Sequence, residues 1–354
     1  MGRKFLVLGS HIALGVYVPA IIIARFLKRK GQQVDFCYHE DLYIDEKKSG
    51  ISKNKYQFHK NYRLAQVAHS MPSRNESAVD PKKKEGFIQK CVEQRYDSIL
   101  LLSGFWVDLI NELVQINHYY NGKVKYIHMD AVESNSWKNK ELSLAENVWL
   151  FRKEGNQVNY VLDKAEAKDR NNRNGRIVIH GGGWGMGNYQ SVIKELNEKG
   201  FQLDIVVYYK DEVDSTDTVN RYFLLDPDWE PDVATKSFPR LLSFEQNHWS
   251  VLEGEKESID SPILNLIRNS QAIISKPGGG TLLDSLMTST PIIFLEALAD
   301  YEKKNMELWI EKGFGLDYKQ WIGEEHQVNK IGQCIEALLK EREKLKIYGD
   351  ELIV

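Results

Sequence analysis

Seven consecutive residues from Gly181 to Gly187 have the composition of a phosphate-binding turn. Five of the seven are glycines (GGGWGMG), and they lie between an apolar segment and a segment of helical periodicity. Glycines let a ligand approach the backbone closely, and a following helix offers unpaired N–H groups and a partial positive charge to an anion. The cluster is no G-x-G-x-x-G, because Asn188 stands where the last glycine would fall, and no P-loop, because no Gly-Lys-Ser/Thr follows. A glycine-rich turn without a ligand is the alternative.

A second glycine turn, from Ser275 to Thr281 (SKPGGGT), repeats this arrangement further along the chain. Two such turns in one domain suggest a diphosphate bridged between two helix N-termini. Asp284 follows on the first turn of the next predicted helix, where its carboxylate could accept hydrogen bonds from a ribose diol. Its alternative role is that of a first-turn acid that complements the helix dipole.

The segments around both turns alternate between predicted strands and helices. The strands are expected at 176–180, 203–208, 271–275 and 291–295, and the helices at 189–198, 263–270 and 281–288. Both turns therefore follow the carboxyl end of a strand, which is where parallel α/β sheets bind ligands.

The N-terminal half begins with the same alternation. A strand at 4–8, a helix at 19–30 and a strand at 33–38 form a βαβ unit, which favours a parallel sheet covered by helices. Residues 45–84 lose the pattern, and we interpret this Lys-, Ser- and Asn-rich stretch as an excursion that is partly helical at best. Regular structure is then expected in a helix at 86–94, strands at 98–102 and 124–128, and a helix at 107–116.

A charged segment almost free of apolar residues, 163–176, separates the two halves. The sequence thus predicts an α/β protein with two Rossmann-like, doubly wound domains that face each other across a cleft. The N-terminal domain would comprise residues 1–165, the linker 166–175 and the C-terminal domain 176–354, and the last helix could pack back on the N-terminal domain.

The segment ISKPGGGTLLDSLMTSTPIIFLEALADYEKKN, which ends at Asn305, resembles the donor-binding region of GT-B nucleotide-sugar glycosyltransferases. The most similar groups are the peptidoglycan N-acetylglucosaminyltransferase and the diacylglycerol glycosyltransferases, within the wider UDP-glycosyltransferase group. Those families have a Ser/Thr-Lys/Arg-x-Gly-x-x-Thr loop, an acidic residue three positions later, a proline that begins the next strand, and an acidic residue or Gln three positions before an Asn. The matching residues here are Ser275, Lys276, Gly278, Thr281, Asp284, Pro291, Glu302 and Asn305.

The resemblance implies a GT-B fold and a role for each matching residue. The diphosphate would be held by Gly278, Gly279, Gly280 and Thr281. Asp284 would bind the ribose, and Glu302 with Asn305 would bind the donor sugar or the neighbouring phosphate. The second diphosphate loop would contain Gly182, Gly183 and Trp184, and the nucleobase would lie near Leu242 to Phe244. The likeness covers most of the C-terminal half, and the N-terminal half only in outline.

The N-terminal half departs from the family at the catalytic base. Related inverting enzymes often have a Gly-His-x-x-Pro element, whereas this chain reads Gly15-Val16-Tyr17-Val18-Pro19 and has Val16 at the histidine position. His11 in the same loop is one candidate for the base, because imidazole titrates near neutral pH. Asp130 is the other, either as the base or as a partner that orients a histidine. The alternatives are a loop histidine that only lines the cleft, and a solvated or capping acid.

The composition of the 354 residues excludes several classes of protein. Lys and Arg number 47 against 50 Asp and Glu, and 42% of residues are hydrophobic, which disfavours both disorder and nucleic-acid binding. Three cysteines without a C-x-x-C pair predict neither a disulfide framework nor a zinc site, and we expect no metal and no cofactor. No segment is predicted to span a bilayer, which takes roughly 18–20 apolar residues. The odd number of widely spaced cysteines fits a reducing compartment, so a cytoplasmic protein is expected.

Lysines gather in the irregular stretch, among them Lys53, Lys55 and Lys60. They could meet an acidic acceptor or a membrane surface, although a solvated loop is favoured.

The leading hypothesis is a glycosyltransferase that moves a sugar from UDP, or another nucleoside diphosphate, to a hydroxyl group with inversion and without a metal. The acceptor would be a small molecule, a lipid or a glycan, and a homodimer is left open. The alternatives are a nucleotide-sugar epimerase or hydrolase on the same fold, and a non-catalytic subunit that binds a nucleotide sugar.

Overall fold

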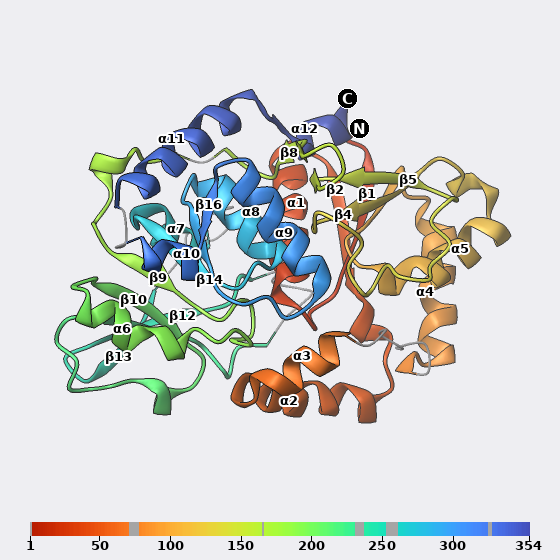
Figure 1. Ribbon diagram of the computed structural model, residues 1–354. Coiled ribbons are helices and arrows are strands. Elements are labelled where there is room, and N and C mark those ends of the chain that lie inside the picture. Colours follow the sequence, from red (N-terminus) through yellow and green to blue (C-terminus); the bar gives the residue numbers. More distant parts are fainter. Residues whose placement is uncertain (1, 71–77, 165, 231–236, 253–260, 325–327) are drawn as a thin grey trace.

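A parallel five-stranded sheet forms the centre of the N-terminal half (Figure 1). The computed structural model describes residues 2–70, 78–164, 166–230, 237–252, 261–324 and 328–354. The strand order is β2-β1-β3-β4-β5, and the strands are β1 (Lys4–Gly9), β2 (Gln33–Tyr38), β3 (Ser98–Leu101), β4 (Val124–His128) and β5 (Glu146–Trp149). Every neighbouring pair is parallel, so all carboxyl ends lie at one edge of the sheet.

Helix α1 (Leu14–Arg29) begins five residues before its predicted start and contains Pro19. Proline favours the first turn of a helix, which is why the sequence pattern indicated a start at this residue. In the structure Pro19 is the sixth residue of α1. Because proline has no N–H, the helix lacks one backbone hydrogen bond there, the one to the carbonyl oxygen of residue 15. Tyr17 and Ile21 are completely buried, and α1 packs against α8 (Gly279–Thr288) of the other half.

The stretch expected to be irregular is instead largely helical, which corrects the interpretation of residues 45–84. It contains α2 (Asp45–Lys60), α3 (Tyr62–Ser70) and the start of α4 (Pro81–Gln94); residues 71–77 lie outside the described part. Asp80 caps α4 by accepting from the N–H of Lys82 at 2.8 Å, and Pro81 occupies the first helical position. Acidic residues in the first turn of α2 and basic ones in its last turn complement the helix dipole. The apolar periodicity is weak because α2 and α3 contact the other half through aromatic and polar side chains.

A mixed eight-stranded sheet forms the centre of the C-terminal half, in the order β13-β12-β11-β10-β9-β14-β15-β16. The strands from β11 to β13 pair antiparallel and the others pair parallel. Their bounds are β9 (Ile177–Ile179), β10 (Leu203–Val207), β11 (Arg221–Leu225), β12 (Leu241–Glu245), β13 (His248–Leu252), β14 (Ala272–Ser275), β15 (Ile292–Phe294) and β16 (Gly315–Asp317). The α/β class with two helix-covered sheets, one parallel and one mainly parallel, agrees with the prediction.

Helices cover both sheets. The remaining ones are α5 (Val107–Ile116), α6 (Ile193–Glu198), α7 (Pro262–Asn269), α8 (Gly279–Thr288), α9 (Asp300–Glu311), α10 (Tyr318–Gly323), α11 (Val328–Lys344) and α12 (Tyr348–Ile353). Two short ribbons, β6 (Phe151–Arg152) with β7 (Gln157–Val158) and β8 (Tyr160–Val161) with β17 (Lys346–Ile347), complete the fold.

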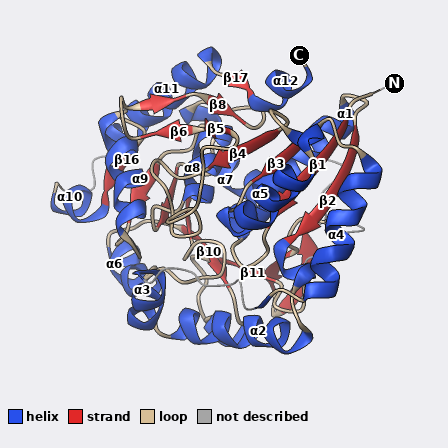
Figure 2. Ribbon diagram, turned by 90° about the vertical axis from the view of Figure 1, so that its right-hand side faces the viewer, coloured by secondary structure: helices blue, strands red, loops and turns tan. Residues whose placement is uncertain are grey.

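The chain returns to its beginning at the C-terminus. Arg3 donates to the backbone oxygen of Leu352 at 2.9 Å, and Lys30 pairs with Asp350 at 3.0 Å, so that α12 lies beside α1. Figure 1 and Figure 2 place α11 and α12 at one side of the molecule and α2 and α3 at the opposite side. The proposed domain limits at 165 and 176 stay predictions, although the large sheets do take their strands from residues 4–149 and 177–317.

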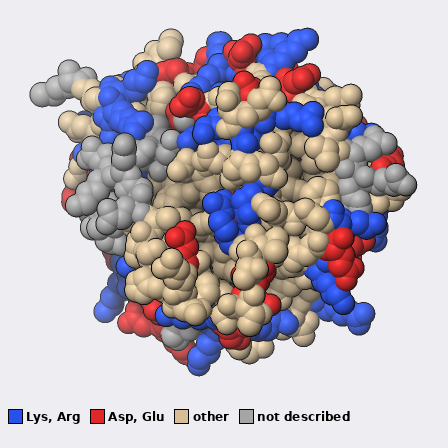
Figure 3. All heavy atoms as spheres, turned by 90° about the vertical axis from the view of Figure 1, so that its left-hand side faces the viewer, with Lys and Arg blue, Asp and Glu red and all other residues tan. Residues whose placement is uncertain are grey.

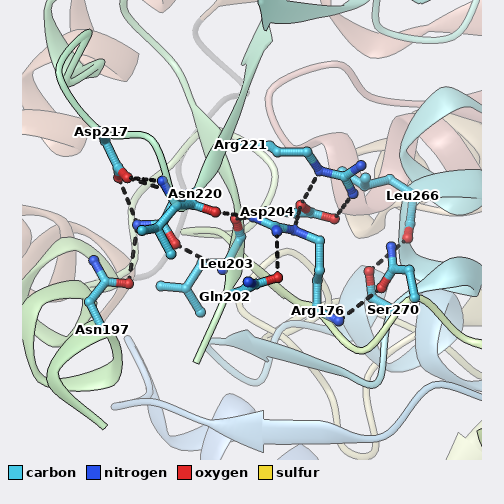
Figure 4. Close-up of polar contacts among 12 residues, drawn as sticks. Arg176, Asn197, Gln202, Leu203, Asp204, Asp217, Asn220, Arg221, Leu266 and Ser270 are labelled. Carbon is cyan, nitrogen blue, oxygen red and sulfur yellow. Dashed lines mark hydrogen bonds and ion pairs between the residues drawn. The ribbon is translucent and has the colours of Figure 1, made fainter. Parts of the chain in front are cut away.

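A buried carboxylate lies near the amino ends of the strands in the C-terminal sheet. Asp204 on β10 has no exposed side-chain surface and accepts from Arg221 at 2.7 and 2.6 Å and from Arg176 at 2.7 Å (Figure 4). Arg176 directly precedes β9 and Arg221 is the first residue of β11, and these two strands are the parallel neighbours of β10. This ion-pair network joins three central strands at the end opposite to the glycine turns.

Charged side chains of both signs are interspersed over the face drawn in Figure 3, in keeping with the formal net charge of −3. Among the described residues no helix is both long and apolar enough to cross a membrane.

Candidate functional site

A cavity of about 500 Å³ lies between the two halves. Its walls come from the β1–α1 loop, α2, the loop after β4, the glycine cluster after β9 and the turn between β14 and α8. These loops follow the carboxyl ends of parallel strands, which is where sheets of this kind bind ligands. The tertiary structure thus brings the two predicted glycine turns to one cavity.

The turn after β14 gives the cavity an open helix N-terminus. Helix α8 starts at Gly279, two residues earlier than expected, so that the glycines form its first turn. Gly278 is the N-cap and provides no side-chain hydrogen bond, which leaves the first N–H groups of α8 without a cap. The turn therefore has the geometry of an anion site.

The glycines of this turn also allow the two halves to approach each other. A Cβ on Gly279 would collide with the backbone oxygen of Met129 and lie 2.7 Å from Oδ1 of Asp130. A Cβ on Gly280 would lie 2.8 Å from the Cα of Gly15 on α1. Larger residues would separate the halves at this point.

The glycine cluster after β9 is held in place by both halves. Gly182 and Gly185 have φ angles of +82° and +67°, which favour glycine, and the backbone oxygen of Gly182 accepts from the hydroxyl of Tyr208. Trp184 donates through Nε1 to the backbone oxygen of Ile12 at 2.9 Å. Nδ1 of His59 on α2 lies 2.8 Å from the backbone oxygen of Gly185. The cluster is thus a fixed wall of the cavity.

A chain of polar contacts links the predicted donor residues to the N-terminal half. Lys276 pairs with Glu302, whose other carboxylate oxygen accepts from the N–H of Leu298 at 2.8 Å. Asn305 is completely buried and does not line the cavity. Its amide donates to Asp130 at 2.8 Å and to the backbone oxygen of Pro277 at 2.9 Å, and accepts from the N–H of Ala131 at 2.7 Å. Asn305 therefore joins the two halves, and its donors are already occupied.

Asp130 lies at the centre of this interdomain contact and lines the cavity. Burial raises its pKa to about 6, while the hydrogen bond from Asn305 acts in the opposite direction. The carboxylate is close to Gly279, at the positive end of α8. A carboxylate with this pKa can accept a proton near neutral pH.

Asp284 lines the cavity from the second turn of α8, one turn later than expected. The side chain is half-buried and accepts no hydrogen bond from the described part of the chain, and burial raises its pKa to about 7. The geometry leaves both carboxylate oxygens available to a ligand.

Asp284→Asn should change how the stability of the protein depends on pH. Between the ordinary pKa of 3.8 and the folded-state value of about 7, the folded protein holds a proton that the unfolded chain has lost. The free energy of unfolding therefore falls as pH rises through this interval, and asparagine removes this contribution. The melting temperature of Asp284→Asn minus that of the wild type should therefore become more positive as pH is increased from 5 to 8. The exposed Asp228→Asn serves as the control, and identical pH profiles for all three proteins would contradict the expectation.

Three other predicted residues lie outside the cavity lining. Ser275 is buried, with its hydroxyl 3.4 Å from Nδ1 of His180. His11 faces Glu40 and Tyr38 instead, while its neighbours Ser10 and Ile12 line the cavity. Burial lowers the pKa of His11 to about 4, which makes its imidazole a weak base at neutral pH.

Phe244 also lies away from the cavity and packs against Trp249, with ring centroids 4.8 Å apart. The expected base pocket at 242–244 is therefore not part of this cavity. Because β12 runs antiparallel to β11, it is the start of β12, at Leu241, that lies beside the end of β11, at Leu225. Leu241 and Leu225 line the cavity instead.

Two further residues line the cavity. Sequence reasoning missed His180, and it named Lys55 only among lysines for which a solvated loop was favoured. His180 is the last residue of the strand expected at 176–180, directly before the glycine cluster. This position could have identified it as a candidate site residue. Its Nδ1 accepts from the N–H of Gly182 at 3.0 Å, and burial lowers its pKa to about 4. The neutral ring thus carries its proton on Nε2, which has no partner in the described structure. Lys55 gave no such signal, because its place depends on α2 crossing to the other half.

No group of three or more His, Cys, Asp or Glu side chains within the described ranges is arranged to hold a metal ion.

No protein-family model and no curated protein sequence matches this chain. Solved structures do match its fold. The glycosyltransferase SsfS6 of Streptomyces sp. SF2575 is similar with a TM-score of 0.56 and 9% identity, over 99% of each chain. The glycosyltransferase SnogD of Streptomyces nogalater has a TM-score of 0.51 and 12% identity, over 100% of this chain and 99% of its own. The spinosyn rhamnosyltransferase SpnG, solved with thymidine diphosphate, has a TM-score of 0.50 and 9% identity, over 96% of this chain and 95% of its own.

These similarities extend over the whole chain, and at such low identity they concern the fold. The predicted GT-B fold, with two Rossmann-like halves around a cleft, is confirmed.

Proposed function

We propose that this protein is a glycosyltransferase that takes a sugar from a nucleoside diphosphate bound in the interdomain cavity. The observation that supports this most is the N-terminus of α8 at Gly278, which has no side-chain cap from its N-cap residue and lines the cavity together with the glycine cluster. Helix N-termini bind phosphate through their N–H groups and their dipole. The fold agrees, since its structural neighbours are named glycosyltransferases.

The N–H groups of α8 would stabilise the charge that develops on the leaving diphosphate, without requiring a metal for this step. Asp284 would bind the ribose, because its oxygens are unpaired in the cavity. UDP is the expected nucleotide, and TDP is the second choice because SpnG was solved with thymidine diphosphate. The acceptor would enter from the N-terminal half, as a small molecule, a lipid or a glycan.

Asp130 is proposed as the base that removes the proton from the acceptor hydroxyl. It lies beside the first turn of α8, next to the place where the bond between sugar and phosphate would be broken. Inversion would require the acceptor oxygen to attack the anomeric carbon from the side opposite the diphosphate. The hydroxyl proton would then pass to Asp130, and the diphosphate would leave with the bonding electron pair, stabilised by the N–H groups of α8. His11 is the weaker candidate because it lies outside the cavity lining and its pKa is lowered to about 4.

Binding of UDP or TDP, measured by calorimetry, tests the proposal. Wild-type protein should bind at least one of them with a saturable heat, and Gly279→Asp should raise the Kd at least about tenfold. The new carboxylate would collide with the backbone of Met129 and repel the phosphates at the helix N-terminus. Gly86→Asp on the exposed surface of α4 is the matched control, because a side chain there meets no atom within 4 Å.

Absence of saturable binding in the wild type would overturn the proposal, as would equal affinities for Gly279→Asp and Gly86→Asp. Turnover of a panel of UDP-sugars and TDP-sugars separates the remaining alternatives. Release of free sugar at a useful rate without an acceptor indicates a hydrolase, conversion of one nucleotide sugar to another indicates an epimerase, and binding without turnover indicates a non-catalytic subunit.

A further inference from the structure

Helix α2 brings a lysine from the N-terminal half to the glycine cluster of the C-terminal half. Nζ of Lys55 lies 3.4 Å from the centroid of the Trp184 indole, and both residues line the cavity. Trp184 belongs to the glycine cluster and is fixed by its hydrogen bond to Ile12. The ammonium group of Lys55 therefore lies at the wall of the proposed diphosphate site.

The position of Lys55 is fixed by contacts that the next residues of α2 make with the other half. Tyr56 packs against Tyr209 with ring centroids 5.1 Å apart, and His59 contacts both Gly185 and Glu212. Lys60 lies 3.5 Å from Asp211 and 3.6 Å from Glu212. The favoured interpretation as a solvated loop is therefore wrong for Lys55, which lines the cavity, whereas Lys60 is exposed but lies on a helix.

The charge of Lys55 lacks a close counter-ion. No carboxylate of the described residues lies within 4.0 Å of its Nζ, whereas Lys276, the other lysine of the cavity, is paired with Glu302. The buried carboxylate of Glu40 is occupied by the hydroxyl of Ser10 at 2.5 Å and the N–H of His11 at 3.0 Å. Burial lowers the pKa of Lys55 to about 8. An ammonium group that is partly removed from water and contacts an indole ring but no close carboxylate is incompletely compensated, and an anionic ligand beside it would relieve this cost.

We propose that Lys55 binds a phosphate group of the nucleoside diphosphate, so that the donor site is completed by a cation from the N-terminal half. This inference rests on the proposed function. The ammonium group beside Trp184 and the helix N-terminus at Gly278 line the same cavity. A diphosphate that reaches both would be neutralised by a cation in addition to the N–H groups. Because α2 holds the lysine, the arrangement of the two halves and the affinity for the diphosphate depend on each other.

Calorimetry with UDP, TDP, uridine and thymidine on full-length Lys55→Met tests this. For the nucleotide that the wild type binds, the Kd should rise about tenfold, the expected effect of losing a hydrogen bond to a charged group. The Kd for the matching nucleoside, which lacks phosphate, should stay within about a factor of two. Lys55→Arg keeps the charge and should recover most of the affinity.

Lys53→Met is the matched control, because Lys53 is exposed two positions earlier on the same helix. Circular dichroism and melting temperature establish that each variant is folded. The inference is overturned if Lys55→Met and Lys53→Met bind the nucleotide equally well, an outcome that would place the natural anion of Lys55 on the acceptor. It is also overturned if uridine or thymidine loses affinity by the same factor as its diphosphate. A wild type that binds neither nucleotide overturns the proposed function itself, so the two failures are distinguishable.

Discussion

Asp130→Asn should slow the turnover of a bound nucleotide sugar by about 10²–10⁴-fold, the usual contribution of a general base, without weakening the binding of the nucleoside diphosphate. Asparagine has the same shape and still offers an oxygen to the amide of Asn305, which donates to Asp130 at 2.8 Å in the native protein. The substitution therefore removes proton acceptance and keeps the contact between the halves. Release of UDP or TDP from the corresponding nucleotide sugars measures the rate.

The pH profile makes this expectation specific. Burial raises the pKa of Asp130 to about 6, and the base has to be ionised to accept a proton. The rate of the wild type should therefore fall as pH decreases through about 6, and the residual rate of Asp130→Asn should lack this limb.

His11→Gln serves as the comparison, because His11 was the other candidate from the sequence. It should retain most of the rate, since the imidazole faces Glu40 and lies outside the cavity lining. A large loss in His11→Gln together with a normal rate in Asp130→Asn would assign the base to the histidine and overturn the role given to Asp130.

Asp204→Ala should lower the free energy of unfolding by about 3–5 kcal/mol, the typical cost of breaking a buried ion pair by removing one partner. The carboxylate is completely buried and accepts three hydrogen bonds from Arg176 and Arg221. Its loss leaves the guanidinium of Arg176 partly buried beside an empty space, and removes the contact that joins three neighbouring strands. Urea unfolding followed by circular dichroism measures the change.

Glu154→Ala is the matched control for Asp204→Ala. Glu154 also pairs with an arginine, Arg152, but the two side chains are 77% and 44% exposed. Such surface pairs contribute about 0–1 kcal/mol, so this variant should unfold almost like the wild type. Nucleotide binding should persist in Asp204→Ala below its unfolding temperature, because the network lies at the end of the strands opposite to the cavity. Equal unfolding curves for the two variants would contradict the explanation.

The elements that the sequence predicted best are those whose signal is local. The strands β1 to β4 appear within a residue of their expected bounds; β1, β3 and β4 are mainly apolar runs, whereas the edge strand β2 alternates between buried and more exposed residues. Burial on both faces of a parallel sheet requires such runs, whatever lies around them. The helices α2 and α3 were missed because their stability depends on partners from the other half, such as Glu212 and Tyr209, which no local pattern reveals.

The same distinction applies to the site. The glycine turns could be found from composition alone, because strand, glycine turn and helix follow each other in the chain. The sequence also identified Lys276, Glu302, Asn305 and Asp130 as candidate site residues. Their contacts in the structure, however, indicate roles that differ from those implied by the resemblance. Asn305 holds Asp130 instead of facing the cavity, and this depends on a contact across 175 positions of the chain.

By itself the sequence determined the α/β class, the two glycine turns and the residues of the resemblance, since each of these depends on neighbours along the chain. Only the tertiary structure decided that Lys55 lies on Trp184, that Asp130 adjoins the first turn of α8, and that His11 and Phe244 face away from the cavity. These placements depend on how α1 packs on α8 and how α2 contacts the glycine cluster. Close packing between the halves is specified by many distant contacts together, and no single segment of the chain contains that information.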